Sequence, residues 1–185
     1  MDMVREIQRY VESECRKETN IYGMNAYDGH FVSVVKYAKL LAEETGADME
    51  IVELSAWLHD IGSIVSGDSE NHHIVGSVHA EQLLKKYNYP QDRIDRVKHC
   101  ILAHRGSQDI PRESIEAECV ADGDALSHFD GINSLFYLAL VVKKLDPFEA
   151  KIFVREKLQR SWKKVTPRAK ALIKPKYDAA MLLLE

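Results

Sequence analysis

One stretch, Ser55-Ala56-Trp57-Leu58-His59-Asp60-Ile61-Gly62, constrains this chain more than any other. It reads as the end of an apolar helix that presents a histidine and an aspartate side by side and stops at a glycine. An ionised carboxylate at such a place needs a strong partner, because burying a lone charge is costly. Neutral imidazole and carboxylate both bind divalent first-row metals well. Taken alone, the pair is more simply interpreted as two polar residues at the end of a helix. Whether it binds a metal therefore depends on further ligand residues along the chain.

The rest of the chain reads as amphipathic helices, and we find no convincing strand pattern. Apolar stripes at helical spacing predict the following helices: residues 3–17, Asp28 to Gly46, Asp48 to Gly62, His72 to Tyr87, Pro90 to Gly106, Ser114 through Leu126, Ile132 to Leu145, and Pro147 to Trp162. Residues 63–70 and 106–112 are predicted loops. Pro175 interrupts residues 168–184, which predicts two short helices or one kinked helix. We therefore predict an all-α fold.

The termini and the cysteines indicate the compartment. The N-terminus lacks an apolar signal segment, and no apolar run approaches the roughly 20 residues needed to span a bilayer. The cysteines, Cys15, Cys100 and Cys119, are odd in number and widely spaced, which argues against a disulfide framework or a CxxC zinc site. We expect a cytoplasmic protein without a membrane partner.

Charge is unevenly distributed along the chain. Residues 1–142 contain 13 Lys and Arg against 24 Asp and Glu, whereas residues 143–176 contain 12 against 3. An acidic body suits cation binding, and the basic segment could attract anions such as nucleotides or RNA. The simpler alternative is that the basic helices pack on the acidic body or face solvent. Charge asymmetry alone does not lead us to expect a nucleic-acid partner.

Metal-type ligands fall near helix ends at several places. His30 lies in the first turn of the second predicted helix, and the sixth contains Asp122 and Asp124. Adjacent helical residues point about 100° apart. His59 and Asp60 can therefore meet on one ion only where a helix terminus lets them converge. His30 and Asp124 would complete the site from facing helices, as in the metal centres of helical bundles.

The order and surroundings of these residues resemble the HD-domain metal-dependent phosphohydrolases, and small stand-alone prokaryotic members in particular. The family pattern is a His, then a His-Asp pair, then a later Asp, which His30, His59, Asp60 and Asp124 match in order. The segment Glu118-Cys119-Val120-Ala121-Asp122-Gly123-Asp124-Ala125-Leu126 resembles the final motif. Alignment on Asp-x-Leu favours Asp124 over Asp122 as the ligand.

The resemblance implies a fold and an organisation. It covers about residues 22–130, which we expect to form an HD-domain-like helical bundle with the metal-binding core. Residues 131–185 are expected to form additional C-terminal helices packed on that core, so that residues 1–185 make a single domain.

The resemblance also implies a function. We expect hydrolysis of a phosphate ester, in a nucleotide or another small phosphomonoester, by water activated at a divalent ion bound by His30, His59, Asp60 and Asp124. Imidazole and carboxylate ligands do not select among Mn, Fe, Co, Ni, Zn and Mg, so the sequence does not identify the ion. Asp60 is a candidate to orient or deprotonate the water, and Asp122 is the competing candidate. The sequence does not determine the oligomeric state, and a homo-oligomer is one of the alternatives.

Other polar residues leave alternatives open. Two-metal members take extra histidines from the helix after the His-Asp loop and from the next helix, which points to His72 or His73 and to His104. Alternatively, these histidines line the substrate pocket and contact phosphate without binding metal. Ile101-Leu102-Ala103-His104-Arg105 resembles the segment that supplies the further His. Arg105 is either a phosphate clamp or a charge that complements the helix dipole.

Two departures narrow the resemblance. Members that cut cyclic dinucleotides have Lys at the position of Ser63, and some subfamilies have a second Asp at the position of Ser127. One competing function is a non-catalytic nucleotide-binding or regulatory module that keeps the metal site. Another is a di-iron oxygenase, which would need His73 or a neighbour, together with His104, as ligands to a second iron.

Overall fold

A computed structural model describes residues 2–105 and 110–185 of the chain. Its helices are α1 (Met3–Cys15), α2 (Met24–Ala26), α3 (Val32–Thr45), α4 (Met49–Leu58), α5 (Ile61–Ser66), α6 (His72–Lys86), α7 (Gln91–Ala103), α8 (Ile115–Asp130), α9 (Ile132–Tyr137), α10 (Pro147–Lys164) and α11 (Pro167–Leu183). Strands are absent from these described residues, which confirms the all-α prediction. The predicted loop over 106–112 lies mostly outside them, at residues 106–109.

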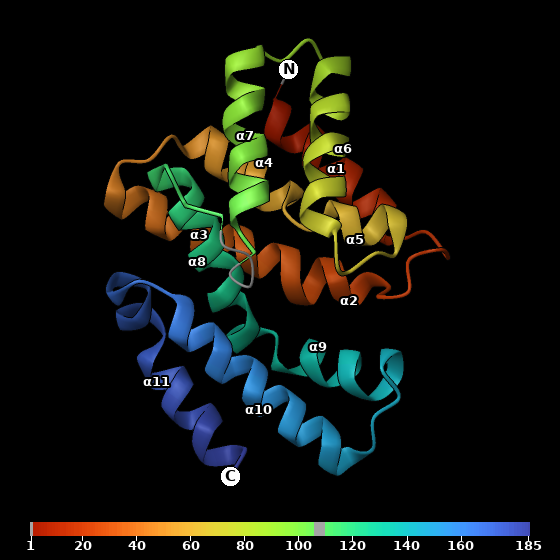
Figure 1. The fold of residues 1–185 in the computed structure, drawn as a ribbon, viewed down its shortest axis with the longest axis vertical. Helices are drawn as coiled ribbons and strands as arrows, with labels where there is room; N and C mark the ends of the chain where they lie inside the picture. The colour runs from red at the N-terminus through yellow and green to blue at the C-terminus, as the bar shows by residue number, and fades with distance from the viewer. Residues whose placement is uncertain (1, 106–109) are drawn as a thin grey trace.

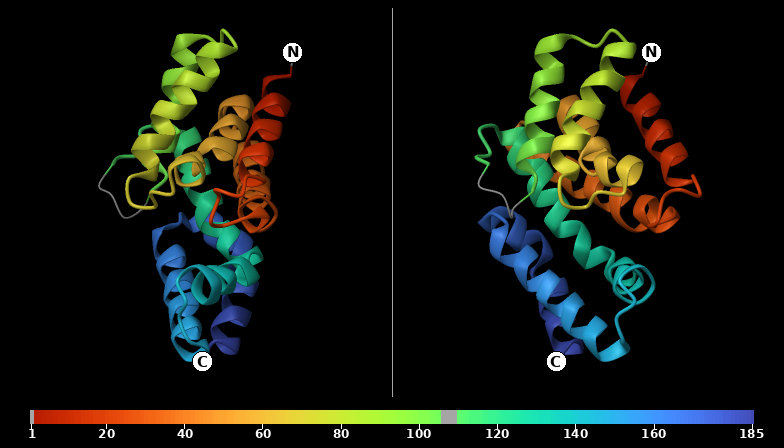
Figure 2. Two further views of the ribbon diagram at one scale, coloured as in Figure 1. Left: turned by 90° about the vertical axis from the view of Figure 1, so that its right-hand side faces the viewer. Right: turned by 45° about the vertical axis from the view of Figure 1, so that its right-hand side comes forward.

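The helices fall into two groups that α8 joins. Helices α6 and α7 form a hairpin at one end of the molecule, and α9, α10 and α11 gather at the other end (Figure 1). Helix α8 runs from the first group into the second, as both turned views also show (Figure 2). It packs most extensively on α3 and also contacts α7, α10 and α11. Residues on opposite faces of α8 therefore touch different parts of the chain.

Helix α4 lies at the centre of the first group, with α1, α3, α7 and α8 packed around it. Ile51, Leu54 and Leu58 are fully buried. Burial of each such side chain contributes about 1.5–3 kcal/mol to folding. This apolar helix carries the residue that follows it, His59, into the interior, where it has no exposed surface.

The third predicted helix is wrong at its C-terminal end. It ends at Leu58, not at Gly62, and a short turn at His59 and Asp60 leads into α5. Helix α5 occupies part of the predicted 63–70 loop, because Ile61 and Ile64 give it an apolar side that is buried in the core. The chain thus changes direction at the His-Asp pair.

The second predicted helix begins earlier than expected. It does not start at Asp28; α2 begins at Met24 and passes through a π-helical turn, Tyr27–Phe31, into α3. In this turn the backbone N–H of Val32 donates to the carbonyl of Tyr27, five residues back. The buried side chains of Tyr27 and Phe31 hold the widened turn against the core.

The C-terminal predictions were closer to the structure. Helix α9 continues into a second π-helical turn, Leu138–Val142. Helix α11 is one helix that contains Pro175, so the alternative of two short helices is wrong. Within the described parts of the chain, no single helix is long and apolar enough to cross a bilayer. The pair formed by Ile115–Asp130 and Ile132–Val142 passes on length and composition together, but it bends by 80°.

We expect Gly62→Ala to destabilise the fold, because a Cβ at Gly62 would lie 2.1 Å from the carbonyl oxygen of His72 and 2.7 Å from the amide nitrogen of Gly76. Forced separation of α5 and α6 should lower the free energy of unfolding by about 1–3 kcal/mol in urea denaturation. Gly76→Ala is the matched control at the same crossing, since its nearest contact would be 3.3 Å. Equal losses in the two variants would contradict this account of the helix crossing.

Candidate metal centre

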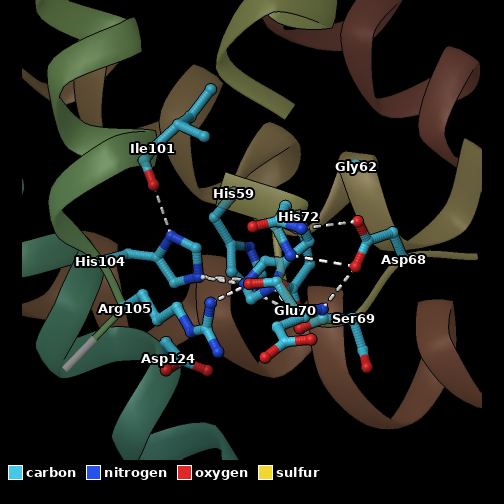
Figure 3. A network of polar contacts seen from close by, with 12 residues as sticks. His59, Gly62, Asp68, Ser69, Glu70, His72, Ile101, His104, Arg105 and Asp124 are labelled. Atoms are coloured by element: carbon cyan, nitrogen blue, oxygen red, sulfur yellow. Dashed lines mark hydrogen bonds and ion pairs between the residues drawn. The ribbon is translucent and has the colours of Figure 1, made fainter. Parts of the chain in front are cut away.

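Side chains from five segments of the chain converge at one place in the interior. His30 comes from the π-helical turn before α3, and His59 and Asp60 come from the turn between α4 and α5. His72 is the first residue of α6, and His104 follows α7. Figure 3 shows His59, His72 and His104 directed toward one another, with Asp124 approaching from α8.

One oxygen of the Asp60 carboxylate faces the first part of this cluster. Asp60 Oδ2 lies 3.3 Å from His30 Nε2 and 3.5 Å from His59 Nε2. Asp124 Oδ1 lies 3.7 Å from the same nitrogen of His30. The ligand atoms of His30, His59 and Asp60 all lie within 4.8 Å of one another, whereas Asp124 joins His30 in a separate set that also includes His128. His30 thus links the predicted ligand Asp124 to the other three.

The other oxygen of the carboxylate faces two further histidines. Asp60 Oδ1 lies 3.1 Å from His72 Nε2 and 3.4 Å from His104 Nε2. Asp60, His72 and His104 form a second set of ligand atoms that all lie within 4.8 Å of one another. Asp60 belongs to both sets, one oxygen to each.

The other ring nitrogen of each histidine is held by a hydrogen-bond acceptor. Three Nδ1–H groups donate to backbone carbonyls: His59 to Ala56 at 2.8 Å, His72 to Ser69 at 2.9 Å and His104 to Ile101 at 2.6 Å. His30 Nδ1 lies 3.0 Å from Ser127 Oγ, which itself donates to the Asp124 carbonyl and so accepts from the ring. Since each Nδ1 donates, each neutral ring presents a lone pair at Nε2.

These lone pairs face one another at short range. His30 Nε2 lies 3.0 Å from His59 Nε2, and His72 Nε2 lies 3.2 Å from His104 Nε2. Two unprotonated nitrogens repel each other at this distance, so the arrangement is stable only with an electron-pair acceptor, a proton or a metal ion, between them. A divalent metal ion is such an acceptor, and imidazole with carboxylate is the donor set it takes. The residues present therefore fit a metal.

The ionisation of the cluster suits metal binding. Burial is the main cause that lowers the pKa of His59, to about 4, so the ring is neutral at pH 7. Burial alone would raise the pKa of Asp60, but the surrounding histidines outweigh it and hold that pKa well below its usual value. The same holds for Asp124, where the charge of Lys164 is the largest opposing effect. Neutral rings and ionised carboxylates are the forms that bind metal.

Three further predicted residues lie elsewhere or have other partners. The carboxylate of Asp122 accepts from Thr166 Oγ1 at 2.5 Å and lies 3.4 Å from Arg112 Nη1, away from the cluster. His73 is buried, and its Nδ1 has no hydrogen-bond partner among the described residues. Arg105 donates to the carbonyl of Glu70, as Figure 3 shows, and so ties the end of α7 to the loop before α6.

Sequence reasoning missed three residues at the cluster. Lys164 of α10 lies 3.2 Å from Asp124 Oδ2, and His128 Nε2 lies 3.8 Å from Asp124 Oδ1. Lys157, also of α10, lines the adjoining cleft. The four-residue spacing of Asp124 and His128 is a signal for one helix face. The lysines had no local signal beyond the basic composition of their segment.

A cleft of about 470 Å³ opens beside the cluster. Its polar end includes His30, Asp60, His72 and Lys157. Its other walls are largely apolar and come from α2, α5 and the α9 region: Ile21, Tyr22, Ala26, Ile64, Leu135, Tyr137, Leu138 and Val142. This volume is typical of small-molecule sites.

We expect the metal-free protein to lose stability as the pH falls from 6.5 toward 4. The pKa of His59 is lowered on folding from 6.5 to about 4, so the unfolded chain binds its proton more tightly. The contribution is full above pH 6.5 and decreases by roughly 2 kcal/mol between pH 7 and pH 5. Urea denaturation of chelator-treated protein at the two pH values measures it. His59→Asn should show a smaller decrease, and an identical decrease would refute the assignment.

Comparison with known proteins identifies relatives by sequence and solved structures that share the fold. Ribonuclease Y of Symbiobacterium thermophilum is 32% identical over 129 residues, which is 70% of this chain and 23% of that protein. Ribonuclease Y of Lactobacillus acidophilus is 36% identical over 106 residues, 57% of this chain and 18% of that protein. The chain thus spans less than a quarter of the length of these relatives.

Two solved structures share the fold. The crystal structure of Bacillus subtilis YpgQ in complex with ADP has a TM-score of 0.70 at 23% identity and covers 97% of this chain and 92% of that one. A protein from Lactobacillus plantarum has a TM-score of 0.67 at 23% identity, with 98% and 92% covered. The HD-domain family profile matches residues 27–128, which include His30, the His59–Asp60 pair and Asp124. The chain therefore belongs to the HD-domain superfamily of metal-dependent phosphohydrolases.

Proposed function

We propose that the protein hydrolyses a small phosphate ester, such as a nucleotide, at a centre of two divalent ions that share Asp60. The approach of His30 to His59 and of His72 to His104 carries this proposal, because each pair of Nε2 lone pairs needs an electron-pair acceptor. The split of Asp60 oxygens between the pairs supports one ion for each pair. His72 and His104 were expected either to bind a second metal or to contact the phosphate. Their position on one oxygen of Asp60 favours metal binding.

The residues of the cluster hold the reacting groups. When bound, divalent ions lower the pKa of a water molecule and stabilise negative charge on phosphate oxygens. Asp60, with its low pKa, is a poor proton acceptor, so its role is to hold the centre rather than to take a proton from water. Lys164 keeps Asp124 ionised and orients its carboxylate through the contact at Oδ2.

We assign Asp122 and Arg105 to positioning roles. Asp122 accepts from the backbone N–H and the hydroxyl of Thr166, the N-cap of α11, and so joins α8 to the C-terminal helices. Arg105 holds the backbone at Glu70, two residues before His72. Neither side chain is among those that line the cleft.

The cleft favours a substrate of nucleotide size. It has a polar end at the cluster for a phosphate and an apolar region for an organic group. The ADP in the YpgQ structure, whose fold this chain shares, agrees with that choice. RNA cleavage by the ribonuclease Y relatives is a weaker guide, because the chain spans less than a quarter of their length.

The test is metal-dependent turnover. Chelator-treated protein should lose hydrolysis of a panel of nucleotides and phosphomonoesters, and Mn²⁺ or another divalent ion should restore it. Asp60→Asn should reduce kcat at least about 100-fold, since both ions would lose a carboxylate ligand. Asp92→Asn is the matched control, because this exposed carboxylate lies at the end of α7 opposite His104. Metal analysis should give two ions per chain.

Other outcomes would replace the proposal. Nucleotide binding without turnover across the panel would indicate a regulatory module. Two irons per chain together with oxygen consumption would indicate an oxygenase. Cleavage of RNA oligonucleotides without turnover of mononucleotides would move the substrate class to RNA. Full activity of Asp60→Asn would exclude the cluster as the reaction centre.

A further inference from the structure

Two lysines line the cleft, Lys143 and Lys157, and neither amine has a carboxylate partner among the described residues. Lys157 is the one on which the charges of Asp124 and Asp60 act, so it is the lysine that belongs to the cluster. Lys164, about two turns further along α10, is instead paired with Asp124 Oδ2 at 3.2 Å. Of the two lysines of α10 at the centre, only Lys157 has a free charge to offer a ligand.

The charge balance of the loaded centre points to an anion beside Lys157. Asp60 and Asp124 are the carboxylates of the cluster, and one divalent ion would already balance both of them. The charges of Lys157 and Lys164 would then be uncompensated, and a second ion would increase the excess. Burial is the main cause that lowers the pKa of Lys157, so its charge has less solvent stabilisation than that of an exposed lysine and gains more from a bound anion.

The position of Lys157 relative to the apolar walls defines which part of a ligand it meets. Leu135, Leu138 and Val142 line the cleft from the α9 region, and Tyr22 lines it from the segment before α2. An organic group is most stable against these side chains, where it leaves water. The anionic group of the same ligand then belongs at the polar end, with Lys157 and the cluster.

We propose that Lys157 binds the phosphate of the substrate, so that α10 contributes directly to the substrate site. This inference rests on the proposed function, because it takes the ligand to be a phosphate ester. It assigns a specificity role to a residue outside the 27–128 region that matches the HD-domain family. Substitution of Lys157 should not change the affinity for ligands that lack the phosphate.

The experiment compares two ligands that differ in phosphate. Binding of the methylene analogue of ADP and of adenosine is measured by calorimetry with the Mn²⁺-loaded protein. Lys157→Met should weaken binding of the analogue about 10- to 100-fold, as expected for loss of a hydrogen bond to a charged group, and leave adenosine unaffected. Lys157→Arg should retain most of the affinity.

The control is Lys163→Met, which removes the same charge from an exposed position of α10 and should change neither ligand. All variants should keep the wild-type metal content and helical circular dichroism. The inference is overturned by a Lys157→Met variant that binds the analogue as wild type does, by equal loss for adenosine, or by a wild-type protein that binds neither the analogue nor inorganic phosphate. Selective loss in a protein that hydrolyses nothing would refute only the proposed function.

Discussion

The carboxylate of Asp60 is the interaction on which the centre depends. Its two oxygens face two pairs of histidines. Without it, His72 and His104 would have no carboxylate beside them, and His30 and His59 would have only Asp124, 3.7 Å from His30 Nε2. The fold keeps this carboxylate in place by ending α4 one residue before His59 and starting α5 immediately after Asp60. The bend between α4 and α5 therefore determines where the Asp60 carboxylate lies relative to the histidines.

Most of the helices could be predicted from the sequence, because apolar spacing and capping residues determine helices locally. Helices begin at Asp48 and Ser114 as predicted, and each of these side chains accepts a backbone hydrogen bond as the N-cap. The end of α4 was not readable, since Ile61 continues the apolar pattern across the bend. Periodicity reports which residues are buried and does not report a change of helix direction.

The predicted ligands His30, His59 and Asp60 lie together, and Asp124 lies with His30. The order of these residues in the sequence was enough to single them out, because it resembles the pattern of the family whose profile matches residues 27–128. Alignment on Asp-x-Leu favoured Asp124 over Asp122, and helix geometry explains why only one of the two lies at the centre. Residues two apart on a helix point about 200° from each other, so α8 can present only one of them to His30. Lys157 and Lys164 could not be assigned from sequence, because their approach to the centre depends on how α10 docks on α8.

The π-helical turn at Tyr27–Phe31 makes the cleft sensitive to chain length. A regular helix would need one residue fewer in this turn and would have better backbone hydrogen-bond geometry. Removing that residue would rotate the preceding chain by about 100° relative to α3. Tyr22 and Ala26, which line the cleft from this preceding chain, would then turn away from His30 although no ligand had been substituted. At this place the number of residues determines the shape of the cleft as much as their identity does.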